Sequence, residues 1–390
     1  MLSNREPYLT AKLQGFGTTI FAEMSQLAIA TNSVNLGQGF PDTDAPREVL
    51  DAAIAAVDGG LNQYPPGPGM PVLRQAIVDH QQRFYGITLD PDTEVLVTAG
   101  ATEALAGALL GLLDTGDEVV VLDPMFDSYA PCIALAGATA KPVLLRPPAY
   151  AIDLDQLRAA VTPKTKLILL NNPHNPTGRV FTQEELQGIA DLAIERDVLV
   201  VSDEVYEHLR FDGVRHIPMA TLPGMRERTL TISSGGKTFN TTGWKVGWAC
   251  GPAALVKAAR TAKQFLTYVS SGPFQPAIAV GLGLPDSFYA GVAADLQSKR
   301  DRLLPGLVEA GFDVFPTSGT YFVTADIRPL RADGDGMAFC RELPHRCGVV
   351  AIPNEVLYAD KAAGRHLVRF AFCKRLEVLD EAVSRLKTLA

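Results

Sequence analysis

Residues 166–206 read KLILLNNPHNPTGRVFTQEELQGIADLAIERDVLVVSDEVY, and this stretch decides the fold class. It contains two apolar runs, Lys166–Leu170 and Val198–Ser202, separated by a stretch of helical character, Thr182–Glu195. Thr182 is followed three residues later by Glu185, a capping box that predicts where this helix begins. Near-continuous apolar strands that alternate with helices indicate a mostly parallel sheet covered on both faces.

The same alternation extends outward from this stretch, from Glu94 to about Cys250. Helical stretches lie at Glu103–Leu113 and Tyr129–Ala136. The further apolar, β-branched runs are Glu94–Thr98, Glu118–Leu122, Thr229–Ser233 and Val246–Cys250. We therefore expect an α/β fold with a large domain over residues 46–285.

The C-terminal part, from about Ser287 onward, has a different pattern of strands and helices. A long helical region, Ser287–Gly311, is followed by shorter strands and two further helices. The predicted strands are Phe312–Pro316, Thr320–Asp326, Val349–Ile352 and His366–Phe372, and the helices are Gly336–Cys347 and Leu376–Ala390. This pattern predicts a smaller α+β domain over residues 286–390. Residues 1–45 are expected to form an N-terminal arm and part of that domain.

Composition narrows the class of protein. The 390 residues are 47% hydrophobic and 20% charged, which is ordinary for a globular protein and excludes disorder or a coiled coil. With 35 basic and 43 acidic side chains the formal net charge is −8, which argues against a nucleic-acid partner. No apolar run approaches the roughly 20 residues that span a bilayer, and residues 1–17 lack the apolar core of a signal peptide.

The cysteine and histidine patterns give no support for a disulfide framework or a metal site. The five cysteines are odd in number and none form a CxxC pair, and the six histidines lack HExxH spacing. We therefore expect a cytoplasmic protein that uses no metal and has no membrane partner.

Ligands of open α/β sheets bind at the carboxyl ends of the strands, so the residues after each strand are the candidates. Ala101 and Thr102 open a helix directly after the first strand, where backbone N–H groups and a hydroxyl suit a phosphate, although a plain tight turn fits equally. Phe126, beyond the next strand, is able to stack on a planar cofactor or to be a core aromatic. Asn175 follows the third strand between two Asn-Pro steps, a density of Asn and Pro that favours a functional loop.

The later strand ends carry charged groups. Asp203 closes an apolar strand, where a carboxylate is costly unless it caps a helix or holds a cationic ligand; Tyr206 follows it. Lys237 comes after Gly235 and Gly236 at the next strand end, where a lysine is able to approach a cofactor closely. Lys245 and Arg369 are further basic groups near strands, and Arg369 lies inside an alternating run, where it needs an anion.

Together these residues suit one cofactor. Pyridoxal phosphate chemistry needs a lysine for covalent attachment, a carboxylate at the pyridinium nitrogen, and donors at the ring oxygen and the phosphate. A phosphate cup, a ring, an Asn, an Asp–Tyr pair and a Lys occur in this order on successive strand ends.

At this point the sequence resembles the fold-type I, class I/II aminotransferases that depend on pyridoxal phosphate. The motifs are NNPHNPTG at 171–178, SDEVY at 202–206 and SSGGKTFNTTGWKVGW at 233–248, and the resemblance runs from NLGQGFP at 35–41 to Arg369. It implies a seven-stranded, mostly parallel sheet between helices in the large domain, and a homodimer.

The resemblance also implies a role for each candidate. Lys237 would be the Schiff-base lysine and general base, and Asp203 would pair with the pyridinium nitrogen. Tyr206 and Asn175 would bond the ring oxygen, and Phe126 would stack on the ring. The phosphate would be held by Ala101, Thr102, Ser234 and Lys245, with Tyr64 reaching across from a second subunit. Arg369 would bind the substrate α-carboxylate bidentately, helped by Asn175 and Gly37.

Two departures from the usual class I pattern bear on the substrate. Lys245 stands where arginine is usual, and Ser234-Gly235-Gly236 stands where a turn that contains serine or alanine is usual. Both are similar to the kynurenine/glutamine/methionine transaminase subgroup. Within it the chain most resembles actinobacterial N-succinyldiaminopimelate aminotransferases, through TTIFAEMS, NQYPPGPG, DEVYEHL and VRFAFCKR.

The expected reaction is a ping-pong transfer of an amino group from an amino acid to 2-oxoglutarate. The best substrate expectation is N-succinyl-LL-2,6-diaminopimelate, in lysine and diaminopimelate biosynthesis. A broad methionine/kynurenine/glutamine transaminase and a carbon–sulfur β-lyase use the same cofactor residues and remain alternatives. A pyridoxal-dependent transcription regulator would need a DNA-binding domain before Gly37, and a plain α/β binding protein would leave these residues as coincidence.

Overall fold

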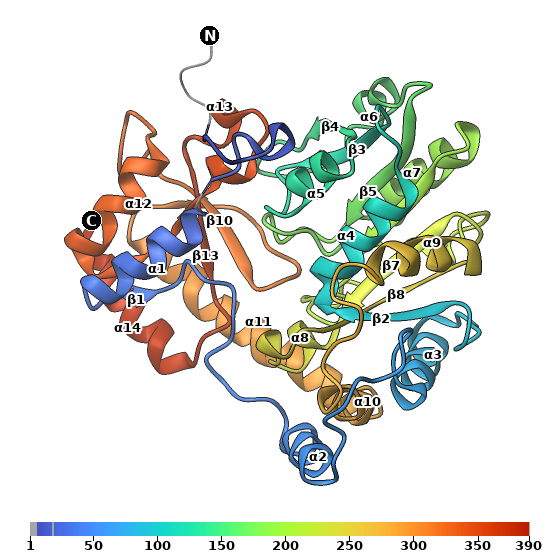
Figure 1. The fold of residues 1–390 in the computed structure, drawn as a ribbon. Coiled ribbons are helices and arrows are strands. Elements are labelled where there is room, and N and C mark those ends of the chain that lie inside the picture. The colour runs from blue at the N-terminus through green and yellow to red at the C-terminus, as the bar shows by residue number, and fades with distance from the viewer. Residues whose placement is uncertain (1–5, 18, 390) are drawn as a thin grey trace.

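A seven-stranded sheet forms the centre of the larger part of the computed structural model, which describes residues 6–17 and 19–389 (Figure 1). Its order is β2-β8-β7-β6-β5-β3-β4, and β8 alone runs antiparallel to its neighbours. The strands are β2 (Val95–Ala99), β3 (Glu118–Asp123), β4 (Thr139–Leu144), β5 (Thr165–Asn171), β6 (Leu199–Asp203), β7 (Thr229–Ser234) and β8 (Val246–Cys250). The predicted mostly parallel sheet is therefore confirmed.

Strand β4 is the member of this sheet that the apolar runs did not reveal. It pairs only with β3, so it is an edge strand, and it contains Lys141 and Pro142. Proline and charged residues are tolerated at an edge, where one side of the backbone needs no partner strand. An edge strand of this kind lacks the continuous apolar pattern of a central one.

Helices cover both faces of the sheet, as the alternation along β5 requires. Leu167 and Leu169 enter one core cluster with α4, while Ile168 and Leu170 enter another with α7. The helices of this part are α2 (Arg47–Asp58), α3 (Pro71–Tyr85), α4 (Gly100–Leu112), α5 (Tyr129–Leu135), α6 (Leu154–Ala160), α7 (Gln183–Glu195), α8 (Gly235–Thr238), α9 (Ala253–Lys263) and α10 (Phe274–Leu282). The predicted capping box of α7 is present, with Thr182 and Glu185 bonded reciprocally.

The C-terminal part packs with the N-terminal segment. Ile20 and Met24 of α1 share a core cluster with Phe370 of β13, and Figure 1 shows α1 and β1 among the orange and red C-terminal elements. A four-stranded antiparallel sheet has the order β12-β13-β10-β9, and β1 pairs with β11 in a separate parallel pair. The strands are β1 (Val34–Asn35), β9 (Asp313–Val314), β10 (Phe322–Asp326), β11 (Val349–Val350), β12 (Ile352–Pro353) and β13 (Leu367–Ala371); the helices are α1 (Ile20–Ala30), α11 (Asp286–Glu309), α12 (Gly336–Cys347), α13 (Lys361–Gly364) and α14 (Leu376–Leu386).

One predicted strand was wrong. Val349–Ile352 is not a single strand, because Val350 pairs with Asn35 of β1 while Ile352 pairs with Arg369 of β13. The chain changes sheets at Ala351, and an unbroken apolar run carries no sign of such a change. Ala390, the last residue of the predicted C-terminal helix, lies outside the described residues.

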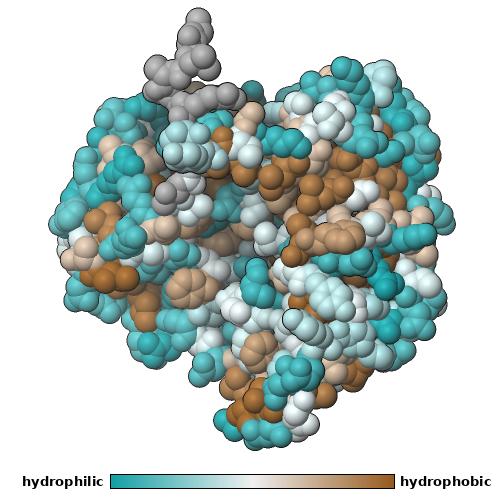
Figure 2. All heavy atoms as spheres, in the orientation of Figure 1, coloured by the Kyte–Doolittle hydropathy of each residue, from teal (hydrophilic) through white to brown (hydrophobic). Residues whose placement is uncertain are grey.

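The surface is hollowed between the C-terminal part and the part that holds the seven-stranded sheet, as Figure 2 shows. Within residues 6–17 and 19–389 no single helix is long and apolar enough to cross a membrane. Helices α10 and α11 meet that test only when taken together, and a bend of 92° separates them.

Candidate active site

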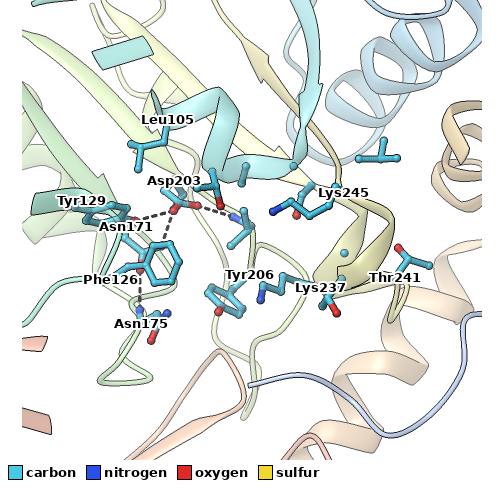
Figure 3. A pocket seen from close by; sticks show the side chains of 18 residues that line it. Leu105, Phe126, Tyr129, Asn171, Asn175, Asp203, Tyr206, Lys237, Thr241 and Lys245 are labelled. Atoms are coloured by element: carbon cyan, nitrogen blue, oxygen red, sulfur yellow. Dashed lines mark hydrogen bonds between the residues drawn. The ribbon is translucent and has the colours of Figure 1, made fainter. Parts of the chain in front are cut away.

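A cavity lies at the carboxyl ends of the central parallel strands, where β5, β6 and β7 end at Asn171, Asp203 and Ser234 (Figure 3). It brings together most of the residues that the sequence singled out, from loops far apart in the chain. Those that line it are Ala101, Thr102, Phe126, Asn175, Asp203, Tyr206, Ser234, Lys237 and Lys245. The candidate residues therefore do lie together at the carboxyl ends of the strands of this sheet.

Asp203 is a buried carboxylate with a hydroxyl partner. Tyr129 Oη donates to Asp203 Oδ2 at 2.6 Å, and the backbone N–H of Val205 lies 3.4 Å from Oδ1. Burial raises the pKa of Asp203 to about 6, an effect that the Tyr129 hydroxyl opposes. A buried carboxylate with this pKa gains a strong partner if a cationic ring nitrogen comes into the cavity.

Asn175 is fixed by the loop that follows β5. Its backbone N–H donates to Asn171 Oδ1 at 2.7 Å, and Asn171 Nδ2 donates to the carbonyl of Asp203 at 2.9 Å. Asn171 thus ties the end of β5 to the end of β6 and holds the turn at Asn175. In Figure 3 the Asn171 and Asn175 side chains follow one another down the side of the cavity next to Phe126.

Lys237 projects into the cavity from α8, and its amine is close to two tyrosines. Lys237 Nζ donates to Tyr321 Oη at 3.0 Å and lies 5.6 Å from the ring centre of Tyr206. Burial lowers the pKa of Lys237 to about 8, although Cys373 and Asp203 favour its charged form. A substantial fraction of the amine is therefore neutral, and so nucleophilic, near pH 8.

The start of α4 forms a small cup with Lys245. Lys245 Nζ would lie 3.1 Å from a Cβ added to Gly100, the first residue of α4, so the ammonium stands beside this helix N-terminus. A Cβ at Gly247 would lie 2.5 Å from the backbone nitrogen of Ala101, so only glycine allows β8 to approach so closely. Backbone N–H groups, the Thr102 hydroxyl and an ammonium together suit a phosphate.

Arg369 lies beside the cavity rather than in its lining. Its side chain is buried, Nη1 donates to Asn175 Oδ1 at 3.0 Å, and Nη2 lies 3.5 Å from the carbonyl oxygen of Gly37. Within the described chain its Nε has no hydrogen-bond partner, and burial lowers the pKa of Arg369 to about 10. A buried guanidinium with neutral acceptors and an unused donor is suited to an incoming carboxylate.

Tyr64 is the one predicted residue that lies apart from the others. Its side chain is 83% exposed, and its ring contacts that of Tyr268 edge-on, with the ring centres 5.7 Å apart. In a single chain it does not line the cavity.

Sequence reasoning missed three residues that complete the site. Tyr129 was read only as a helix start, Asn171 as part of a turn, and Tyr321 as part of a strand. Asn171 could have been found as the first Asn of a doubled pair at a strand end. Tyr129 and Tyr321 gave no such signal, because each reaches the site only through tertiary packing.

The residues present fit pyridoxal phosphate. Asp203 suits a protonated ring nitrogen, the α4 cup with Lys245 suits a phosphate, and Lys237 supplies an amine between them. Phe126 and Val205 both line the same cavity, which suits a flat ring.

Comparisons with known proteins agree with this chemistry. The family model described as aminotransferase class I and II matches residues 31–386. A solved N-succinyldiaminopimelate aminotransferase from Mycobacterium tuberculosis is 52% identical, with a TM-score of 0.96 over 98% of this chain and all of that chain. The sequence named as the probable N-succinyldiaminopimelate aminotransferase DapC of that organism is 52% identical over 97% of this chain and 98% of its own length.

A second relative carries a different substrate name. The solved methionine aminotransferase of Escherichia coli is 39% identical, with a TM-score of 0.93 over 97% of this chain and 99% of that chain. The match of family model, sequence and structure over most of the chain leads to one conclusion: the chain belongs to the class I and II aminotransferases and is a transaminase that uses pyridoxal phosphate.

Proposed function

We propose that this enzyme transfers an amino group from N-succinyl-LL-2,6-diaminopimelate to 2-oxoglutarate by a ping-pong mechanism, in lysine and diaminopimelate biosynthesis. The observation that carries the substrate is the 52% identity over almost the whole chain to a relative with that name, against 39% for the methionine enzyme. The cavity supports the reaction class, since the Lys237 amine lines it and the buried Arg369 guanidinium contacts Asn175, another lining residue.

We assign the roles of the site residues as follows. Lys237 carries the cofactor, Asp203 pairs with its ring nitrogen, and Phe126 stacks on the ring. Tyr206 and Asn175 bond the ring oxygen, and Arg369 with Gly37 and Asn175 binds the substrate carboxylate. The phosphate is held by Ala101, Thr102, Ser234 and Lys245, with Tyr64 supplied by a second subunit.

Pyridoxal phosphate, when bound, supplies an aldehyde that receives the amino group and a ring that withdraws electrons. Asp203, as the anion, keeps the ring nitrogen protonated and so maintains that withdrawal. Arg369 fixes the substrate carboxylate and thereby orients Cα. Lys237 would take the Cα proton through its free amine, for which its pKa of about 8 is well placed.

The hollow beside the site suits a long substrate. A cavity of about 850 Å³ is lined by Phe21, Asp127, Arg341 and Lys361 among others, and the ring centre of Phe21 lies 5.3 Å from Arg369 Cζ. A succinylated donor ends in carboxylates, and this cavity's wall carries Lys361 and also Arg341, which pairs with Glu23 at 2.7 Å. This arrangement supports a donor that extends well beyond its reacting end.

We also propose the division into residues 1–45, 46–285 and 286–390, supported by the gap between α10 and α11 at Gly283–Pro285.

A homodimer is supported by the exposed apolar side chains of Tyr64, Phe265 and Tyr268. A cytoplasmic location is supported by the five cysteines, all of which are free.

The test is a titration of the purified holoenzyme with single amino donors while its visible absorbance is followed. The donors are N-succinyldiaminopimelate, methionine, kynurenine, glutamine and cystathionine, without an acceptor. We expect the succinylated compound to change the cofactor spectrum at the lowest concentration. A stronger response to methionine or kynurenine would show a broad transaminase, and pyruvate and ammonia from cystathionine would show a β-lyase.

A further inference from the structure

Tyr321 contacts the amine of Lys237, although no sequence motif pointed to it. Lys237 Nζ donates to Tyr321 Oη at 3.0 Å, and Tyr321 Oη in turn donates to the carbonyl oxygen of Gly39 at 2.6 Å. A phenol has one proton, and here it is given to Gly39. The oxygen lone pairs of Tyr321 therefore face Lys237, and Tyr321 acts toward the amine as an acceptor.

The Tyr321 hydroxyl is held rigidly. Its side chain is 1% exposed, and its ring packs edge-on against Tyr206 and Phe322, with ring centres 5.5 and 4.7 Å away. A Cβ on Gly39 would lie 2.4 Å from the Phe322 ring, so glycine is needed to bring that carbonyl to the tyrosine.

The backbone before Tyr321 is strained. Thr320 has φ of 65°, in the left-handed region that a β-branched residue rarely adopts, and it is fully buried. Strain of this kind persists only where the surrounding structure over-determines it, and it clusters at functional sites. The strained residue directly precedes the one that contacts the lysine.

Lys237 needs such a partner because its amine stands between two cavities. Besides the cofactor cavity, Lys237 and Tyr321 line a second one of about 240 Å³ that also includes Cys373 and Asn240. Across the described residues, Tyr321 Oη is the one hydrogen-bond acceptor of Lys237 Nζ. Without that hydroxyl, no polar contact selects the orientation of the amine.

We propose that Tyr321 is the positioning residue of Lys237: its hydroxyl accepts one N–H of the amine and so directs the nitrogen lone pair toward the cofactor cavity. This inference rests on the proposed function, in which Lys237 carries the cofactor and moves the Cα proton. Tyr321 exchanges no proton in this role; it accepts a hydrogen bond from the amine and from the ammonium alike.

The first test uses the cofactor-free protein. Cyanate labels neutral amines, and mass spectrometry of the Lys237 peptide gives the labelling midpoint as a function of pH. An acceptor stabilises the ammonium more than the amine, so Tyr321→Phe is expected to lower this midpoint by about one pH unit. Tyr150→Phe is the matched control, because Tyr150 is equally buried and its hydroxyl has no partner within the described chain.

The second test uses the holoenzyme. Tyr321→Phe is expected to slow the first half-reaction by about 10- to 100-fold while KM changes less than threefold, because the amine is misdirected and substrate binding is untouched. The pH midpoint of the cofactor absorbance is expected to move as well. If the labelling midpoint and the half-reaction rate of Tyr321→Phe both equal those of Tyr150→Phe, the proposal is wrong.

Two further measurements keep the test decisive. Should Tyr321→Phe not fold by circular dichroism, 3-fluorotyrosine at position 321 retains the ring and weakens the acceptor, and an unchanged midpoint would then overturn the proposal. Borohydride reduction followed by peptide mapping identifies the lysine that carries the cofactor. An adduct elsewhere would refute the role of Lys237, whereas the labelling comparison separately tests the contact with Tyr321.

Discussion

The charge of the Asp203 carboxylate has two opposite effects, one on the stability of the protein and one on the binding of a cationic ring. It is buried at the end of β6 with its pKa raised to about 6, so its anion destabilises the cofactor-free protein at neutral pH. The same anion is what a protonated ring nitrogen requires. Binding of the cofactor thus offsets a cost that the folded chain otherwise carries.

Asp203→Asn is expected to stabilise the cofactor-free protein while it disables the enzyme. The carboxyl of Asp203 has a higher pKa in the folded chain than in the unfolded chain, so as pH rises from about 4 it ionises first in the unfolded chain. The contribution of Asp203 to the free energy of unfolding is therefore fully present below pH 4 and is lost as pH rises through about 6. The substitution removes this loss, raising the free energy of unfolding at pH 8 by about 1–3 kcal/mol. Urea unfolding of both cofactor-free proteins at pH 4, 6 and 8 measures it.

The turnover of the same variant gives the complementary result. Asp203→Asn is expected to lower kcat on the order of a thousandfold, far more than Tyr206→Phe, because it removes the charge that sustains electron withdrawal. A larger loss in Tyr206→Phe would contradict the assignment of Asp203.

Lys237, as the proposed attachment point of the cofactor, is expected to make cofactor binding depend on pH. Because the pKa of Lys237 is about 8, the fraction of Lys237 that is a neutral amine increases as pH rises through that value. The neutral amine is the form that is able to attack an aldehyde. The rate of reconstitution of the cofactor-free protein is therefore expected to rise about tenfold between pH 7 and 9, with its midpoint near 8. Stopped-flow absorbance follows this rate, Lys237→Ala is the control, and a flat profile would show that another group limits the step.

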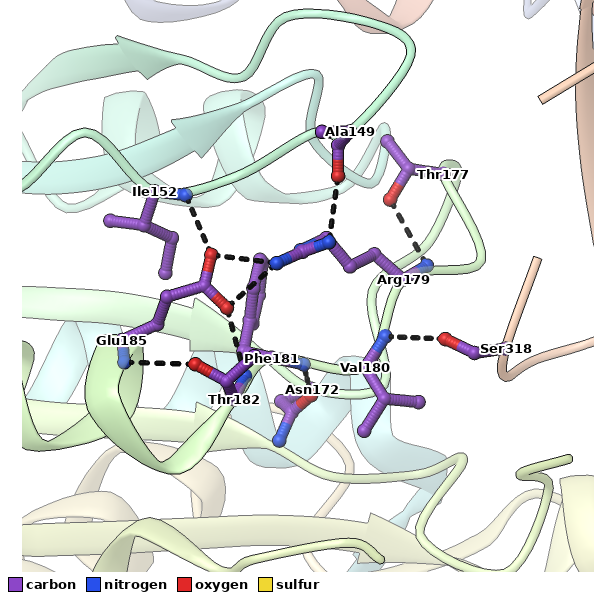
Figure 4. Close-up of polar contacts among 10 residues, drawn as sticks. All are labelled: Ala149, Ile152, Asn172, Thr177, Arg179, Val180, Phe181, Thr182, Glu185 and Ser318. Carbon is purple, nitrogen blue, oxygen red and sulfur yellow. Dashed lines mark hydrogen bonds and ion pairs between the residues drawn. The ribbon is translucent and has the colours of Figure 1, made fainter. Parts of the chain in front are cut away.

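At the scale of elements, the loop between β5 and α7 is held by one carboxylate (Figure 4). Glu185 accepts from Arg179 Nη2 at 2.9 Å and from the backbone N–H groups of Ile152 and Thr182 at 2.9 and 2.8 Å. Arg179 also reaches the carbonyl of Ala149 at 2.8 Å. The capping box thus anchors both the start of α7 and the loop that carries Asn175.

Glu185→Ala is expected to lower the free energy of unfolding by about 2–3 kcal/mol, since it removes a cap and leaves Arg179 without its carboxylate. KM is expected to rise several-fold as well, because Asn175 contacts Arg369. Thermal unfolding and steady-state kinetics measure the two effects. The exposed neighbour Gln183→Ala serves as control, and equal behaviour of both variants would exclude this anchoring role.

The turn after β6 distributes its side chains between two sides. Asp203 and Tyr206 line the cavity, while Glu204 accepts from His216 Nε2 at 2.9 Å and Glu207 accepts from Ser233 at 2.7 Å. Both glutamates are buried, and neither is in the lining of the cavity. In the segment DEVYEHL, Asp203 and Tyr206 therefore line the cavity, while Glu204 and Glu207 form the buried hydrogen bonds that support this turn.

At the scale of the whole molecule, Tyr64 lies outside the cavity that its own chain forms. The loops that carry Tyr64 and Tyr268 lie against each other and expose apolar rings, with Phe265 79% exposed nearby in sequence. An exposed apolar surface of this kind marks an interaction site. We propose that a second copy of the chain covers this surface and that its Tyr64 contributes to the site proposed for the cofactor phosphate.

The protein is accordingly expected to run at about twice 41.8 kDa in size-exclusion chromatography with light scattering. Tyr64→Phe is expected to weaken cofactor affinity about tenfold, the loss of one hydrogen bond to a charged group, without dissociating the dimer. Equilibrium dialysis of the cofactor measures the affinity. A monomer with full cofactor affinity would show that Tyr64 has no such role.

The sequence by itself determined six of the seven strands of the large sheet, helices between several of them, and the candidate residues at the strand ends. It could do so because buried parallel strands are continuous apolar runs, and because polar residues at such ends, including Asp203 and Lys237, are costly without a ligand. The tertiary structure alone decided the rest. Tyr129 is 74 residues from Asp203 along the chain and Tyr321 is 84 residues from Lys237, yet each contacts that residue in the site. Val350 and Ile352, two residues apart, pair in different sheets. Such contacts depend on how distant segments pack, and no local pattern of residues encodes them.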